Sequence, residues 1–336
     1  MRASAIAIAL CLLSAGQSSD AASWRGADAS IKFTVLDDAG APVTNAVVVG
    51  HFASPYGKDY IGDRFDLRTD TNGQCLVVGR GFTFVSGRVA APSHYYSSYK
   101  VSLGDKELTR KSGKWEVSEH RLVLMRVRHP VPMYAGQITI GPVVRNPGQL
   151  IGYDFVVGDW VAPHGKGVHV DMTFQYQKTI LRSDRIEIKP RQDDVRGQVA
   201  RTVEMPLDVD ISMKIAMPNP GDGMIKTKQQ KIGEMVSDYQ APEDGYQPTV
   251  DLFSKQRQEK RHWPGTLESN SDGEALYYIR LRTELDEHGT VKRAWYGKIC
   301  GELDKAPQYF LNPDGTRNVE FDPSKNLSAG GLVAEP

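Results

Sequence analysis

The residues with the clearest chemical potential lie between positions 153 and 171. His164, His169 and Asp171 carry the imidazole and carboxylate groups that bind divalent metal ions in proteins. His169 and Asp171 are two positions apart in a stretch with strand-like alternation, and side chains at that spacing point to one face of a strand. The sequence therefore suggests a metal site at these three residues. The alternative, which a motif this short favours, is a polar strand face beside the glycine-rich loop at 165–167.

Aromatic residues near loops suggest a second kind of site. Trp160 precedes the glycine-rich loop, and Trp263 lies between charged residues and a Pro-Gly pair. An exposed indole ring offers an apolar face on which a sugar ring stacks, while polar neighbours bind the sugar hydroxyls. We therefore predict Trp160 and Trp263 as ligand-binding residues for a glycan. Trp295 instead shares a predicted strand face with Val291 and Ile299, which indicates burial in the core.

The main sequence signatures of enzymes are missing. The chain contains neither the Gly-x-Ser-x-Gly turn of hydrolases nor the His-Glu-x-x-His helix of zinc proteases, and no serine pairs recognisably with a histidine and an acid. We assign no catalytic residue and no cofactor, and we prefer a non-catalytic binding or structural role. The alternative is a hydrolase acting on glycosides or peptides, with its site in the C-terminal half. Catalytic carboxylates need proximity in space rather than a fixed spacing.

These candidate residues must be positioned by β-strands. Between residues 31 and 125, short apolar or alternating runs are separated by turns, and no segment keeps a helical period for three turns. Residues 37–40 and 70–73 are turn sequences in which glycine supplies positive φ and an Asn or Asp before it bonds its own backbone. The pattern predicts an all-β sandwich, with strands at 31–36, 46–52, 75–78, 82–89 and 121–127.

The C-terminal half has the same character. Alternation at 168–176 and at 209–217 predicts strands with one apolar and one polar face. Residues 275–285 and 290–300 are predicted to form a hairpin, with Gly289 where the four-residue connection needs a glycine. We expect this half to be a larger antiparallel β domain and the chain as a whole to be all-β.

The N-terminal segment resembles a known family. Three pieces carry the resemblance, in this order: a turn Gly-Ala-Pro-Val at 40–43, a strand start Asn-Ala-Val-Val at 45–48, and a turn Thr-Asp-Thr-Asn-Gly at 69–73. They resemble the carboxypeptidase regulatory-like domain, a transthyretin-like β-sandwich. The resemblance covers less than a third of the chain. It implies that fold and an accessory role in an exported protein, and it transfers no catalytic residue.

The first residues read as a secretory signal peptide. Arg2 is followed by an apolar run too short to span a membrane and by small residues typical of a cleavage site. We predict cleavage after Gly16 (signal peptide 1–16), or alternatively after Ser23 (1–23). The mature protein is then secreted, periplasmic or part of the cell envelope, with no transmembrane segment. It keeps Cys75 and Cys300, as either one long-range disulfide or two buried thiols.

Proline spacing and charge complete the prediction. We expect a carboxypeptidase regulatory-like sandwich at 28–127, a Pro-rich linker at 128–137 and a β-rich domain at 138–336. In the linker, Pro130 and Pro132 disfavour regular structure. The 41 basic and 41 acidic residues give a formal net charge of zero, which argues against nucleic acid as a partner. The expected partner is a glycan or a component of the cell envelope.

Overall fold

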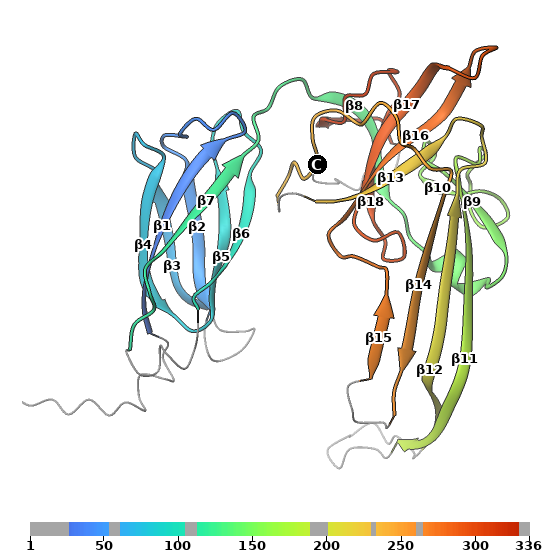
Figure 1. The fold of residues 1–336 in the computed structure, drawn as a ribbon, viewed down its shortest axis with the longest axis horizontal. Coiled ribbons are helices and arrows are strands. Elements are labelled where there is room, and N and C mark those ends of the chain that lie inside the picture. The colour runs from blue at the N-terminus through green and yellow to red at the C-terminus, as the bar shows by residue number, and fades with distance from the viewer. Residues whose placement is uncertain are drawn as a thin grey trace, which may run out of the picture. The chain divides into compact units, whose positions relative to one another are not determined.

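The computed structural model describes residues 27–53, 61–104, 113–188, 201–229, 233–259 and 265–328. The chain divides into two compact units, Met1–Arg126 and Val127–Pro336. Nearly all regular structure in the described ranges is β, as the sequence predicts (Figure 1). A five-residue helix, α3 (Gly141–Arg145), follows the first strand of the second unit. The predicted signal peptide and Trp263 lie outside the described residues.

The first unit consists of two sheets, with strand orders β4-β1-β7 and β3-β2-β5-β6. Neighbouring strands are antiparallel except β1 and β7, which are parallel. The strands are β1 (Ala27–Asp37), β2 (Val47–Ala53), β3 (Ile61–Arg68), β4 (Gln74–Gly81), β5 (Phe84–Ala90), β6 (Ser97–Ser102) and β7 (Ser118–Leu124). Alternate residues of β1 are fully buried, so Ile31, Phe33 and Val35 enter a core that includes Val48 and Phe52 of β2. The alternation in the sequence thus reports the buried face directly.

Three chain reversals share one turn design, at residues 37–40, 70–73 and 286–289. In each, the leading aspartate Oδ1 accepts N–H bonds from the residues two and four positions on, and the glycine N–H donates to the aspartate carbonyl. The glycines have φ between 71° and 83°, where a side chain is disfavoured. The predicted turn positions are therefore confirmed, and the structure adds that the leading aspartate makes the backbone bonds in all three.

The second unit contains two larger sheets, ordered β10-β9-β11-β12-β14-β15 and β13-β16-β17-β18-β8-β19. Figure 1 shows β11, β12 and β14 as long strands of one sheet. The predicted hairpin at 275–300 is confirmed as β16 and β17. The strands are β8 (Val131–Gln137), β9 (Leu150–Asp154), β10 (Asp159–Trp160), β11 (Met172–Ile188), β12 (Arg201–Ala216), β13 (Gly223–Lys228), β14 (Thr249–Arg257), β15 (Thr266–Ser269), β16 (Ala275–Leu285), β17 (Val291–Cys300), β18 (Gln308–Asn312) and β19 (Phe321–Asn326).

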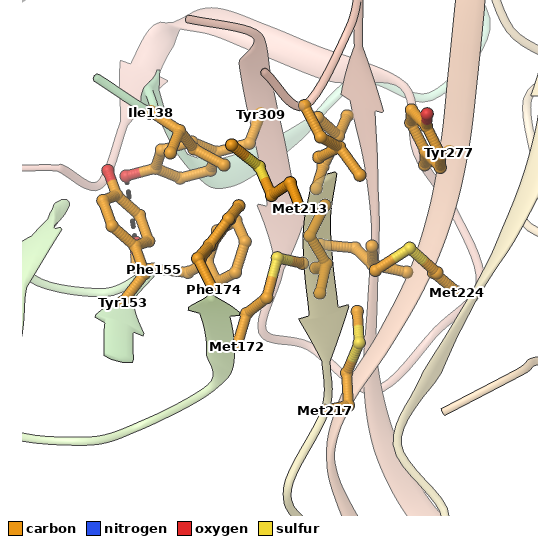
Figure 2. Packing of buried hydrophobic residues seen from close by; sticks show 14 of the residues in the cluster. Ile138, Tyr153, Phe155, Met172, Phe174, Met213, Met217, Met224, Tyr277 and Tyr309 are labelled. Carbon is orange, nitrogen blue, oxygen red and sulfur yellow. Dashed lines mark hydrogen bonds between the residues drawn. The ribbon is translucent and has the colours of Figure 1, made fainter. Parts of the chain in front are cut away.

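The main core of this unit draws side chains from strands of both sheets (Figure 2). Met172, Met213 and Met224 are buried there beside aromatic rings such as Phe174 and Tyr277. Unbranched methionine side chains adapt to the irregular spaces between large rings. Along β16, one set of alternate residues belongs to the main core and the other set belongs to a separate apolar cluster. The second sheet is therefore buried on both faces.

The residues predicted as a linker form a strand instead. Val131–Gln137 is β8, which lies between β18 and β19 in its sheet. β8 pairs with β19 through Val131 and Met133 and with β18 only from Tyr134 onward. Pro132 therefore falls before the β18 ladder, where a missing N–H costs little. Proline content near a unit boundary was a misleading signal here.

Cys75 and Cys300 are both free thiols, one in each unit, and both are partly buried. No helix among the described residues is long and apolar enough to cross a membrane.

Candidate functional site

A buried ion-pair network links the two sheets of the second unit. Arg282 of β16 donates from Nε to Asp171 Oδ1 at 2.8 Å and from Nη2 to Asp171 Oδ2 at 3.1 Å. Its Nη2 also lies 3.4 Å from Asp154 Oδ1. The carboxylates of Asp154 and Asp171 are 1% and 0% exposed, whereas the Arg282 side chain is 25% exposed. Buried charges persist only when they are paired, so the two carboxylates fix the guanidinium and leave part of it at the surface.

A β-bulge presents Arg282 to this network. The pairing of β16 with β17 shifts between Leu281 and Glu284, and Arg282 has a φ of 52°, which non-glycine residues adopt rarely. Asp222 supports the bulge, because its carboxylate accepts the backbone N–H groups of Arg282 at 3.1 Å and Thr283 at 2.8 Å. Bulges commonly re-aim one side chain near functional sites, and strained backbone concentrates there.

Two aromatic rings complete the site. The Arg282 Cζ lies 4.7 Å from the centroid of the Trp295 ring, a cation–π arrangement. Tyr134 of β8 stacks on Trp295, with centroids 6.1 Å apart and planes 12° apart. Both rings are partly buried against the main core, so the predicted burial of Trp295 is only partial. We call Arg282, Trp295, Tyr134 and the neighbouring His169 the Arg282–Trp295 site.

The loop that carries His169 is folded by carboxylates. Asp154 Oδ1 accepts the N–H groups of Val156 and Val157, and its Oδ2 accepts those of Val168 and His169, at 3.0 to 3.2 Å. His169 is 48% exposed, and its Nε2 lies 3.5 Å from Asp171 Oδ1. The loop therefore holds a half-exposed imidazole against the buried ion pair.

The residues predicted as metal ligands do not form a coordination shell. Both oxygens of Asp171 are occupied by Arg282, and Oδ2 also accepts the Phe155 N–H at 2.9 Å. His164 lies in a separate turn, where its N–H donates to the Val161 carbonyl. In the ranges that the structure describes, no three His, Cys, Asp or Glu side chains are arranged to hold a metal ion. His169 and Asp171 precede β11, which begins at Met172, but their side chains do lie together, with His169 Nε2 3.5 Å from Asp171 Oδ1.

Of the two predicted stacking residues, Trp160 has a different role. Its side chain is 2% exposed, and its indole N–H donates to the Thr139 carbonyl at 2.9 Å. The ring packs edge-on against Tyr153 and Phe174, at centroid distances of 5.0 and 5.2 Å. No face of Trp160 is open to a sugar ring, so this prediction is wrong. Trp263 lies outside the described residues.

The charges of Asp154 and Arg282 are fixed by their partners. Burial alone would raise the pKa of Asp154, but the four backbone N–H donors lower it below its ordinary value. Partial burial alone would lower the pKa of Arg282, but the hydrogen bonds and charge of Asp171, with the charge of Asp154, raise it. The ionised forms are therefore the stable ones. Such a site can bind and orient a polar ligand.

Local sequence patterns did not point to Arg282, Asp154 or Tyr134. Arg282 is 111 residues from Asp171 in the chain and 128 from Asp154. Strand periodicity cannot anticipate a bulge, and only the bulge brings this arginine to the two carboxylates. Asp171 and His169 did carry a usable signal, since a polar cluster ahead of a strongly alternating strand marked the loop in which this ion-pair network lies.

Comparisons with known proteins add the following. No protein-family model and no curated protein matches the chain.

Three similar solved structures have TM-scores that define no shared fold. Catechol 1,2-dioxygenase from an Acinetobacter species is similar over 30% of this chain and 53% of its own, at 17% identity and a TM-score of 0.23. A DUF3823 family protein from Parabacteroides merdae covers 88% of this chain and 100% of its own, at 8% identity and a TM-score of 0.20. A candidate carbohydrate-binding protein from Bacteroides uniformis covers 84% and 96%, at 10% identity and a TM-score of 0.19. The chain thus spans about half the length of the dioxygenase that it matches.

Proposed function

We propose that the chain is an exported, non-catalytic β protein that binds a glycan at the Arg282–Trp295 site. The observation that carries this proposal is the pairing of a fixed guanidinium with a half-buried indole ring, 4.7 Å from Cζ to ring centroid. Sugars are bound by apolar contact with aromatic rings together with fixed hydrogen-bonding groups. The site brings a partly exposed aromatic pair, Trp295 and Tyr134, together with a fixed guanidinium.

The remaining donors of the site support a sugar ligand. Nε and Nη2 of Arg282 are engaged by Asp171, whereas its Nη1 makes no hydrogen bond within the described part of the chain. His169 adds a half-exposed imidazole. The guanidinium is held by buried carboxylates, so little conformational entropy of the Arg282 side chain is lost on binding.

The lowered pKa of Asp154 and the pairing of Asp171 favour binding over hydrolysis. A glycosidase of the usual kind needs one carboxyl group with a raised pKa to protonate the leaving group. The pKa of Asp154 is lowered instead, and Asp171 is in a bidentate pair with Arg282. Neither carboxylate of this site suits the acid role.

The sequence supports export and an accessory role. The apolar run after Arg2 is typical of a signal peptide, with cleavage after residue 16 or 23. The motifs at 40–43, 45–48 and 69–73 resemble carboxypeptidase regulatory-like domains, which are accessory modules of exported proteins. Secretion and attachment to the cell envelope belong to this proposal.

Glycan binding by the full chain tests the proposal. Envelope and dietary glycans are screened on an array, and hits are measured by calorimetry with wild type, Arg282→Lys and Trp295→Phe. We expect both variants to weaken binding at least tenfold, because lysine loses the planar stacked donor and phenylalanine is the smaller ring. Arg280→Lys is the matched control, because Arg280 lies in the same strand and stacks on Tyr246 at 4.6 Å, away from the site. Absence of any glycan hit, or unchanged affinity in both variants, would contradict the proposal.

A further inference from the structure

The outer face of sheet β3-β2-β5-β6, in the first unit, gathers basic side chains. Arg64 of β3 is paired with His51 of β2, which is paired with Ser86 of β5, which is paired with Lys100 of β6. Residues directly opposite one another in antiparallel strands share a face, so these four form one row across the sheet. Arg88 of β5 lies on the same face, two residues along its strand from Ser86. We call Arg64, His51, Arg88 and Lys100 the basic face.

A shallow depression of about 390 Å³ lies within the basic face, lined by Arg64, His51 and Arg88 among others. Gly50 and Gly87 also line it and are paired with each other across β2 and β5. A Cβ at either glycine would lie 2.7 Å from the hydroxyl oxygen of Tyr99, a buried core residue. Packing beneath the sheet thus restricts both positions to glycine, and the depression has a backbone floor.

The positive charge of this face is poorly balanced. The outward positions of the four strands carry Arg64, Arg68, Arg88 and Lys100 against one carboxylate, Asp66, which leaves a charge of +3 before His51 is counted. Like charges on one sheet face oppose folding, and the chain as a whole has a net charge of zero. Ion pairs in the described part of this unit lie elsewhere, at Lys32–Glu119, Arg80–Asp28 and Arg126–Asp37.

The geometry of the face indicates an extended ligand. Strands are about 4.8 Å apart, so Arg64 and Lys100 on the two outer strands are separated by about 14 Å at the backbone. A single carboxylate or sulfate group matches only part of this row, whereas a linear polymer with repeated negative charges can contact all of it. Lys100 is held over the Phe84 ring, 4.3 Å from its centroid, and so its ammonium is directed across the same face.

We propose that the basic face binds an acidic polysaccharide, through the carboxylate or sulfate groups of successive sugars. The choice of a polysaccharide among polyanions rests on the proposed glycan-binding function. The charge complementarity and the span of the face are independent of it. Binding by an exposed row of cations is screened by salt, so affinity is expected to fall as ionic strength rises.

The test uses the full chain and four probes: a heparin oligosaccharide for sulfate, an oligogalacturonate for carboxylate, neutral dextran, and a short DNA duplex. Binding is measured by fluorescence anisotropy for wild type and the double variant Arg64→Gln/Arg88→Gln. The matched control is Lys32→Gln/Arg121→Gln, which removes the same charge from the other sheet of this unit. We expect at least a tenfold loss for an acidic glycan in the first variant, less than a twofold change in the control, and no binding of dextran.

The heparin and oligogalacturonate arms identify the anionic group. Equal losses in both double variants would show unspecific charge attraction and overturn the proposal, as would tighter binding of DNA than of both acidic glycans. Binding of neither acidic glycan would also overturn it. An Arg282→Lys variant separates the two sites: if it alone abolishes binding of the acidic glycan, the basic face is excluded and the Arg282–Trp295 site remains supported.

Discussion

Asp222 positions Arg282 through its backbone. The buried carboxylate accepts the Arg282 N–H at 3.1 Å, while the Arg282 guanidinium extends away to Asp171. The bulge in β16 is therefore held at one end by an acceptor for its N–H groups and at the other by an ion pair. This arrangement accounts for a non-glycine residue at a φ of 52°, because two anchors offset the backbone strain.

Replacing Asp222 by asparagine should loosen the bulge. Asparagine keeps one acceptor oxygen, but its N–H₂ group must face a donor. In one orientation that donor is the Thr283 N–H. In the other orientation the N–H₂ group faces both the Arg282 N–H and the Asn219 amide. An unsatisfied buried donor costs about 1–3 kcal/mol. We expect that loss in the free energy of unfolding, measured by urea denaturation, together with weaker ligand binding at Arg282.

Asp286→Asn is the control for this variant. Asp286 makes comparable bonds to backbone N–H groups but lies in an exposed turn, where water can satisfy the displaced donors. We expect it to cost less than Asp222→Asn. Equal losses for the two variants would show that Asp222 has no special role at the bulge.

Alanine substitutions at three glycines distinguish the stability cost of backbone strain from the cost of steric clash. Gly273 has open space around it and no positive φ, Gly40 has open space at a φ of 83°, and Gly73 combines a φ of 71° with the Val35 carbonyl in the path of a Cβ. Substitution by alanine should leave stability nearly unchanged at Gly273 and cost about 1 kcal/mol at Gly40. Gly73→Ala should cost more than Gly40→Ala. Denaturant midpoints measure the series, and any other order would contradict the turn geometry.

The sequence was most informative where local chemistry decides local structure. The Asp-x-x-Gly turns and the alternation of β12, in which Val209, Met213 and Ile215 are buried, follow from backbone conformation and period alone. At other positions the local structure depends on contacts with residues far away in the sequence. In the sequence Pro132 indicates a linker, but the partners of β8 come from residues about 180 positions away and leave the Pro132 nitrogen unused.

The candidate site could be located only in part from the sequence. The loop at 153–171 was identified, but its carboxylates bind backbone N–H groups and an arginine from another strand instead of a metal. The glycine-rich loop after Trp160 favours a surface position for this residue in the sequence. The glycines instead let the loop approach the backbone of β10, since a Cβ at Gly167 would lie 2.8 Å from the Asp159 carbonyl oxygen, while the Trp160 ring points into the core against Tyr153 and Phe174.

Trp160→Phe tests this corrected role for the tryptophan. The variant loses the 2.9 Å bond from the indole N–H to Thr139 and leaves a small cavity between Tyr153 and Phe174. We expect a loss of about 2 kcal/mol in the free energy of unfolding with unchanged glycan affinity for the folded protein. Reduced affinity without reduced stability would restore Trp160 as a ligand-binding residue.

The pH dependence of stability should identify Asp154 as a native-state anion. Its pKa is lowered below the ordinary value of 3.8, so as pH falls through that value the unfolded chain takes up the proton first. The contribution of Asp154 to stability is therefore complete above about pH 5 and is lost as pH falls toward its folded pKa.

Asp154→Asn removes this contribution and should cost about 2 kcal/mol at pH 7. The difference from wild type should then shrink between pH 5 and pH 2. Urea denaturation across this range measures the difference, in which other acidic groups cancel because both proteins carry them. A difference that stays constant with pH would mean that the four backbone donors do not stabilise a charged carboxylate at this position.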